Sequence, residues 1–234
     1  LTVSESCVIR AVAQEAGCLP SSVTTLDYLV NEGFTLPVLC LNADQPKELG
    51  RVYARSQRGV ELSGNVSFYE PEGSFSAPCG ITLSGHTSLA YQKKSFRVHF
   101  RGRYGVSTID YDLFGSDVQS FTSLTIRSGG HDAYNALYLS ELWQDLSLEM
   151  SERVLSMHSR YAIVYVNGAY YGIYAIKEDY SRDFYAAHRG VDPDSVETLS
   201  FPLPVNSSFY REIVEYCAEH DMSQSEHYDY FCGK

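Results

Sequence analysis

The chain has little positive charge. Its 234 residues include 18 lysines and arginines against 29 aspartates and glutamates, which gives a formal net charge of −11. Phosphate backbones and anionic lipid headgroups repel such a surface, so the charge argues against general nucleic-acid binding and electrostatic membrane binding. Long apolar runs are also lacking, and the longest, near residues 161–176, is interrupted by Asn167-Gly168. A membrane-spanning helix needs about 20 apolar residues, so we predict no membrane insertion.

Cysteine is sparse as well. The six cysteines have irregular spacing without any C-x-x-C, and their density is too low for a disulfide scaffold. We interpret them as small buried apolar side chains. The group Cys217, His220, His227 and Cys232 lacks the spacing of a zinc-binding module, so the sequence predicts no metal site.

The common catalytic signatures are missing too. The chain contains no G-x-S-x-G, no H-E-x-x-H and no paired-aspartate metal motif, so we assign no catalytic residue. What the chain has is 44% apolar and 20% charged residues, a composition that excludes disorder and permits a sizeable core. The length predicts one large domain, or one domain with a piece of another. Its first residue is Leu1 and its last is Lys234, and we expect a fragment of a longer protein.

Residues 1–30 are rich in strand-forming residues. Two β-type runs, 8–13 and 22–28, flank a turn at Gly17–Pro20. Two strands are not stable alone, so they either pack on the next part of the chain or belong to a truncated β-domain. Residues 31–33 form a linker.

The remainder predicts an α+β fold with a mainly antiparallel sheet. We expect strands at 36–41, 66–70, 80–84 and 94–100. The hairpin 161–176 turns at Asn167-Gly168 and should be central, because both strands are apolar at nearly every position. Residues 42–46 are rich in turn formers. Leucines at helical spacing predict a long helix over 135–149, packed across the sheet, and further helices cover 178–190 and 207–220.

Two features point toward phosphate chemistry. The strand at 80–84 enters a loop of small residues that is followed by Lys93 and Lys94. Such a loop can hold phosphates, although an ordinary hairpin loop is the more frequent meaning of the pattern. In the predicted strand, Lys94 faces the same side as the apolar residues Phe96 and Val98, because side chains two residues apart point the same way. Glu141 lies inside the predicted long helix, where a carboxylate is either solvated or paired with Lys94.

Several motifs in order resemble the CotH-type family, whose namesake is a spore-coat kinase. The resemblance covers roughly residues 34–234. It is carried by Phe68–Gly73, Cys79–Gly85, Lys93–Arg97, Leu113–Gly115, Arg127–Asp132, Glu141-Leu142, Val166–Tyr174, Lys177-Glu178 and Gly190–Pro193. Residues 1–30 are similar to the last strands of a chitobiase-type, immunoglobulin-like module. Such modules precede CotH domains in large secreted bacterial proteins.

The resemblance implies an atypical kinase-like small lobe that binds ATP and Mg²⁺, in a secreted or cell-surface protein. Lys94 would contact the phosphates, with Lys93 as the runner-up, and Glu141 would orient the lysine. Residues 174–178 would form the hinge beside the adenine. The implied nucleotide-binding residues are Lys94, Lys93, Arg97, Glu141, Gly85, Ser88 and Glu178.

The chain also departs from the family pattern. Leu89 and Ala90 stand where the family usually carries an arginine, and Asn135-Ala136 stands where its long helix usually opens with a basic residue. The family places its metal-binding and catalytic aspartates later than Lys234, so we expect this fragment to be inactive. The alternatives are a non-catalytic surface or adhesion module on the same fold and a structural domain without a ligand. The sequence identifies no protein substrate or partner.

Overall fold

The computed structural model describes residues 2–136, 138–150, 154–198 and 208–232. It contains two compact units, Leu1–Pro193 and Asp194–Lys234. The strands are β1 (Cys7–Ala11), β2 (Thr24–Tyr28), β3 (Val38–Ala43), β4 (Leu62–Glu70), β5 (Gly73–Ser84), β6 (Ser95–His99), β7 (Ile109–Asp110), β8 (Ser120–Phe121), β9 (Ser123–Arg127), β10 (Ser159–Val166) and β11 (Ala169–Lys177). The α-helices are α1 (Pro46–Ala54), α2 (Asp132–Asn135), α3 (Leu139–Met150), α4 (Arg182–Arg189), α5 (Ser208–Glu219) and α6 (Ser225–Cys232). Short 3₁₀ turns occupy Thr87–Ala90, Gly102–Tyr104 and Pro193–Ser195.

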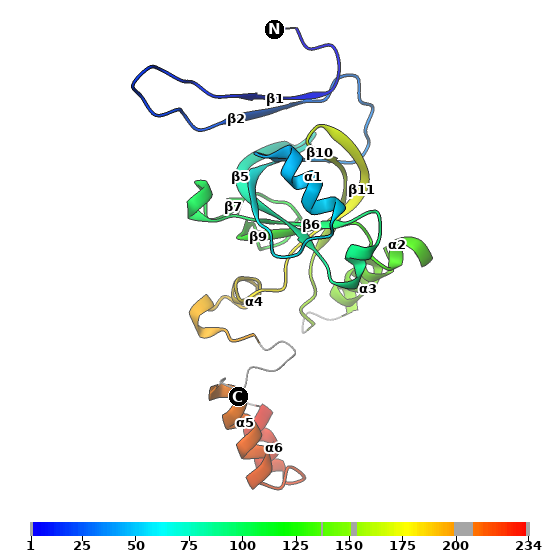
Figure 1. The fold of residues 1–234 in the computed structure, drawn as a ribbon. Helices are drawn as coiled ribbons and strands as arrows, with labels where there is room; N and C mark the ends of the chain where they lie inside the picture. The colour runs from blue at the N-terminus through cyan, green and yellow to red at the C-terminus, as the bar shows by residue number, and fades with distance from the viewer. Residues whose placement is uncertain (1, 137, 151–153, 199–207, 233–234) are drawn as a thin grey trace. The chain divides into compact units, whose positions relative to one another are not determined.

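A closed barrel dominates the first unit (Figure 1). Its seven strands follow the order β10-β11-β9-β6-β5-β4-β3, and β3 pairs with β10 to close the ring. Every neighbouring pair is antiparallel except β10 and β3, which run parallel. Closure gives each strand a hydrogen-bonding partner on both sides. The predicted α+β class with a mainly antiparallel sheet is confirmed, whereas the closure was not predicted.

Side chains alternate between the two faces of each strand, and those on the inner face fill the barrel. Phe96, Val98 and Phe100 are buried in its core, as their parity predicted. Helix α1 adds Leu49 and Val52 to the same core. This helix begins at Pro46, a favourable first residue because proline has no N–H to satisfy there. The sequence-based interpretation of residues 42–46 as turn material missed the helix that starts at their end.

The hairpin of β10 and β11 confirms the prediction for residues 161–176. Asn167 and Gly168 both have positive φ, 50° and 79°, as a type I′ turn requires. On its far sides β10 pairs with β3 and β11 pairs with β9, so neither strand is at an exposed edge. The apolar residues at the end of β10 and at the end of β11 are buried, whereas Tyr170 and Ile173 nearer the turn are exposed.

The first two strands form an antiparallel hairpin that packs on the barrel. Arg10 makes an ion pair with Asp44, directly after β3. The Asn42 side-chain amide donates a hydrogen bond of 2.7 Å to Asp27. The two strands therefore contact the next part of the chain, which was one of the two alternatives, and their origin in an immunoglobulin-like module stays a prediction.

The long helix differs in detail from the expectation for residues 135–149. Tyr138, with a φ of +57°, separates α2 from α3, and Leu137 lies outside the described residues. Among the described side chains of α3, Glu141 is buried, whereas Leu142 and Trp143 are more than half exposed. The helix therefore meets the barrel through a carboxylate rather than through its leucines.

The structure bears on two predictions from the sequence, the absence of membrane insertion and the burial of the cysteines. Among the described residues, no helix is both long enough and apolar enough to cross a membrane, in agreement with the prediction. The cysteines are only partly as expected, because Cys40 and Cys79 are buried but Cys18 and Cys232 are exposed.

Gly64 should be indispensable to barrel closure. A Cβ at this buried position of β4 would lie 2.4 Å from the Asn42 carbonyl oxygen and 2.8 Å from Ile81. We predict that Gly64→Ala lowers the free energy of unfolding by about 1–3 kcal/mol, because overpacking pushes β3 and β4 apart. The matched control is Gly50→Ala in α1, where nothing lies within 4 Å, and alanine should stabilise by up to about 1 kcal/mol. Urea unfolding measures both, and equal stability of the two variants would contradict the account.

Candidate functional site

A row of polar side chains crosses the outward face of four barrel strands. The strand register aligns Thr82 with Arg97, Arg97 with Thr125, and Thr125 with Lys177. Phe96, Val98, Ile126 and Ile176 occupy alternating positions and fill the core, so the polar row faces outward. We call Thr82, Arg97, Thr125 and Lys177 the outer polar row.

At one end of the row, Lys177 pairs with the buried Glu141 of α3. Lys177 Nζ lies 3.1 Å from Glu141 Oε1, and the side chains are 3% and 0% exposed. Arg127 Nε lies 2.9 Å from the same oxygen. Burial lowers the pKa of Lys177, and the neighbouring Glu141 carboxylate opposes that shift. The carboxylate thus compensates the buried Lys177 and also pairs with Arg127, whose side chain is 29% exposed.

At the middle of the row, Arg97 is held by the segment that follows β11. Its guanidinium lies 2.9 Å from Asp179 Oδ1 and donates to Thr125 Oγ1 at 3.4 Å. Ser123 Oγ donates to the other oxygen of Asp179 at 3.2 Å. The Arg97 side chain remains 38% exposed, so a ligand can reach its guanidinium beside Asp179.

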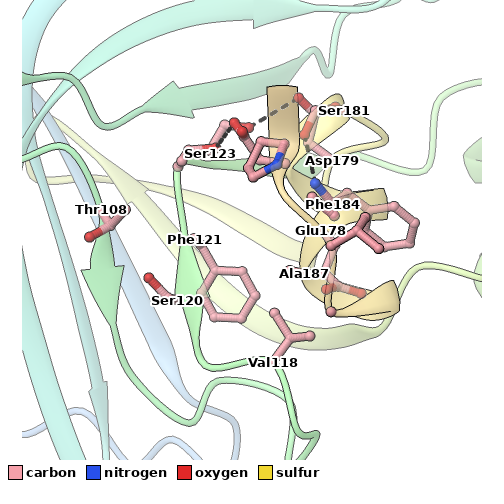
Figure 2. A pocket seen from close by; sticks show the side chains of 16 residues that line it. Thr108, Val118, Ser120, Phe121, Ser123, Glu178, Asp179, Ser181, Phe184 and Ala187 are labelled. Atoms are coloured by element: carbon pink, nitrogen blue, oxygen red, sulfur yellow. Dashed lines mark hydrogen bonds between the residues drawn. The ribbon is translucent and has the colours of Figure 1, made fainter. Parts of the chain in front are cut away.

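Asp179 also borders a pocket of about 410 Å³ (Figure 2). This size is within the range of small-molecule sites. The pocket lies between residues 118–123 and the segment that leads into α4. Its apolar lining includes Val118, Phe121, Phe184 and Val191. Its polar lining includes Ser120, Ser123, Asp179, Ser181 and Asp183.

Two hydrogen bonds fix the pocket wall formed by α4. Ser181 caps the helix by accepting a hydrogen bond from the Phe184 backbone N–H at 3.1 Å. Thr122 Oγ1 donates to Asp183 at 2.9 Å, which ties the first turn of α4 to the chain between β8 and β9. The pocket and the outer polar row are therefore continuous through Asp179 and Ser123.

The predicted pairing of Lys94 with Glu141 is wrong. Lys94 Nζ donates to the Tyr91 carbonyl at 2.6 Å and lies 5.2 Å from the centre of the Tyr53 ring. Glu141 is instead compensated by Lys177 and Arg127. The physical reason is that α3 approaches the barrel at the end of β11, so the lysine of that strand reaches the carboxylate.

Lys93, the second candidate for contacting phosphates, also contacts the main chain. Lys93 Nζ donates to the Ile173 carbonyl at 2.5 Å and lies 4.3 Å from the centre of the Tyr174 ring. Burial lowers the pKa of its ammonium group. Gly85 has a φ of +121°, a backbone conformation in which a residue with a side chain would be strained.

Glu178, predicted beside an adenine, lines the pocket and also contacts two histidines. It is 3% exposed and is hydrogen-bonded to His158 Nδ1 at 2.9 Å and His188 Nε2 at 2.8 Å. Burial acts to raise its pKa, but the hydrogen bonds from the histidines outweigh burial and lower it.

The structure thus divides the seven predicted nucleotide-binding residues among three places. Arg97 and Glu141 belong to the outer polar row and its flank, and Glu178 belongs to the histidine cluster. Gly85, Ser88, Lys93 and Lys94 lie along the loop before β6. Sequence reasoning missed Lys177 as the partner of Glu141, although a lysine closing an apolar strand was a visible signal.

One family model matches the chain. The model is described as "CotH kinase protein", and it covers residues 81–228, well over half of the 234 residues. The matched segment includes the outer polar row, the pocket and helix α3. No curated protein matches the chain.

Glu141 should be the most costly side chain of α3 to remove. We predict that Glu141→Ala lowers the free energy of unfolding by about 3–5 kcal/mol, because Lys177 keeps a buried charge without its partner. Glu149→Ala, an exposed carboxylate on the same helix, is the control and should change stability by less than about 0.5 kcal/mol. Chemical denaturation of both variants measures the difference, and a loss below about 1 kcal/mol for Glu141→Ala would refute the assignment.

Proposed function

This chain belongs to the CotH kinase family, and we propose that it binds ATP along the outer polar row and in the adjoining pocket. The observation that carries the proposal is the buried pair of Lys177 and Glu141, which joins a barrel strand to a helix. Protein kinases use a lysine–glutamate pair between a strand and a helix to position nucleotide phosphates. Here the pair is contiguous with an exposed arginine and a pocket of suitable size.

Charge suggests how a nucleotide would be oriented. On the row, Lys177 is buried against Glu141, and Arg97 is partly exposed beside Asp179. The pocket is lined by the carboxylates of Glu178, Asp179 and Asp183. Phosphates are repelled by carboxylates, and the N–H and O–H groups of a base and a ribose are attracted to them. We therefore place the base and ribose in the pocket and the phosphates toward Arg97.

Mg²⁺ would enter with the nucleotide rather than occupy a protein cage of its own. Glu141 Oε2 is buried and accepts no hydrogen bond from the described residues, but Lys177 and Arg127 flank this carboxylate. Within the described ranges, the one group of three candidate ligands is formed by His158, Glu178 and His188 and includes a single carboxylate. Mg²⁺ prefers several oxygen ligands, so these residues do not fit it.

Nucleotide binding should depend on Arg97. We predict that Arg97→Gln weakens ATP binding at least tenfold in equilibrium dialysis with radiolabelled ATP, because a charge-assisted contact to phosphate is lost. Arg51→Gln, an exposed arginine of α1, is the control and should leave binding unchanged. Lys94→Gln tests the residue that the sequence favoured. A larger loss for Lys94→Gln than for Arg97→Gln would move the phosphates to the loop before β6.

Binding does not by itself give catalysis. We propose that these 234 residues bind ATP without transferring its γ-phosphoryl group, because transfer requires metal-holding carboxylates and a positioned base. Incubation with radiolabelled ATP, Mg²⁺ and generic acceptor proteins should leave the acceptors unlabelled. Labelling that disappears in Arg97→Gln would show that the chain is a complete enzyme.

A non-catalytic surface or adhesion role on the same fold is the second candidate. This role is favoured because, in the described parts of the chain, the one group of three candidate metal ligands includes a single carboxylate. We also propose a secreted or cell-surface location, supported by the similarity of residues 1–30 to modules of secreted bacterial proteins. ATP binding in the dialysis experiment supports the kinase-related role, and its absence supports the surface module.

A further inference from the structure

Two histidines enclose the buried carboxylate of Glu178. His158 Nδ1 lies 2.9 Å from Glu178 Oε2, and His188 Nε2 lies 2.8 Å from Glu178 Oε1. The candidate ligand atoms of all three residues lie within 4.8 Å of one another. The two imidazole rings are stacked, with centroids 5.6 Å apart and an interplanar angle of 16°. Two nitrogen donors and one oxygen donor thus converge on one point.

Three separate elements bring these residues together. His158 directly precedes β10 and Glu178 directly follows β11, and the antiparallel register places them opposite each other. The backbone N–H of His158 donates to Glu178 Oε2 at 2.8 Å, which fixes the carboxylate. His188 comes from the last turn of α4, where its ring contacts Phe184 at a centroid distance of 4.4 Å. The cluster is therefore preorganised by the barrel and by one helix.

We propose that His158, Glu178 and His188 form a binding site for a divalent transition-metal ion, with Zn²⁺ as its natural fit. Neutral imidazole nitrogens and a carboxylate oxygen are ligands that Zn²⁺ accepts, and three protein ligands leave one coordination position for water. The harder ions Mg²⁺ and Ca²⁺ prefer oxygen ligands and are poorly served here.

Side-chain adjustment brings the three residues to the spacing that the ion needs. Ligand atoms around a tetrahedral Zn²⁺ with bonds of about 2.0–2.1 Å lie about 3.4 Å apart. The nitrogen–oxygen pairs are now 2.8 and 2.9 Å apart and use different oxygens of Glu178, and the candidate ligand atoms lie within 4.8 Å of one another. Zn²⁺ takes the place of the ring protons at His158 Nδ1 and His188 Nε2. Each neutral imidazole then carries its one proton on the other ring nitrogen, and an imidazolium releases its second proton to solvent.

The surroundings leave the open coordination position accessible. The side chains of His158 and His188 are 26% and 11% exposed, and both line a hollow together with Ser116 and Asp117. A water molecule in this hollow could complete the coordination shell. Glu178 lies outside the outer polar row but also lines the adjoining pocket. The zinc proposal is carried by the two histidines and this carboxylate, and it does not require ATP to bind.

Zinc titration of the full chain tests the proposal. Metal-free protein is titrated with ZnCl₂ in competition with a chromophoric chelator, and we expect one ion per chain. His158→Gln and His188→Gln should each weaken binding at least tenfold, because each removes a nitrogen ligand. His86→Gln, which changes an exposed histidine of the loop after β5, should bind as tightly as the wild type. Equal affinity in all three variants, or no binding above the chelator background, would overturn the site.

A measurement on the unaltered chain keeps the test decisive if a variant fails to fold. Imidazole NMR signals of the wild type are followed during Zn²⁺ addition. The proposal predicts that the signals of His158 and His188 change together and saturate at one equivalent, while those of His86 stay in place. Changes at His86 that equal those at His158 would indicate nonspecific binding and contradict the proposal.

Discussion

The buried carboxylate of Glu141 is the constraint on which the arrangement of the candidate site depends. It lies on a helix whose Leu139, Leu142 and Leu146 are exposed, and it is compensated by Lys177 from β11 and Arg127 from β9. A carboxylate withdrawn from water needs cationic partners, and each cation withdrawn with it needs the carboxylate. The position of α3 against the barrel is thus set by charge compensation more than by apolar packing.

Barrel closure determines which side chains remain for function. Because each strand is paired on both sides, its backbone groups are satisfied within the ring, and alternation sends one set of side chains inward. Phe96 and Ile126 fill the interior, and Arg97 and Thr125 are left outside beside Lys177. A ligand on the outer polar row would meet a rigid surface whose spacing is fixed by hydrogen bonds.

Local patterns in the sequence missed the short strands β7 and β8 but predicted the turn at Asn167-Gly168, the α+β class and the strands of the barrel except β9. They did so because alternation and positive-φ turn residues are properties of neighbouring residues. Ring closure by β3 and β10 and the convergence of His158 with His188 were beyond the sequence, since both join segments far apart in the chain. The pairing of Lys94 with Glu141 was wrong for the same reason, because parity indicates a face but not which helix covers it.

Chemical-shift mapping on the wild-type chain tests the central claim, that the outer polar row binds nucleotide, most directly. Backbone amide signals are recorded while ATP and Mg²⁺ are added, and no substitution is needed. The account predicts that the largest shifts occur at Arg97, Thr125 and Lys177 and along the pocket residues 120–123. Shifts confined to the loop of residues 85–94, or no shifts at saturating ATP, would contradict it.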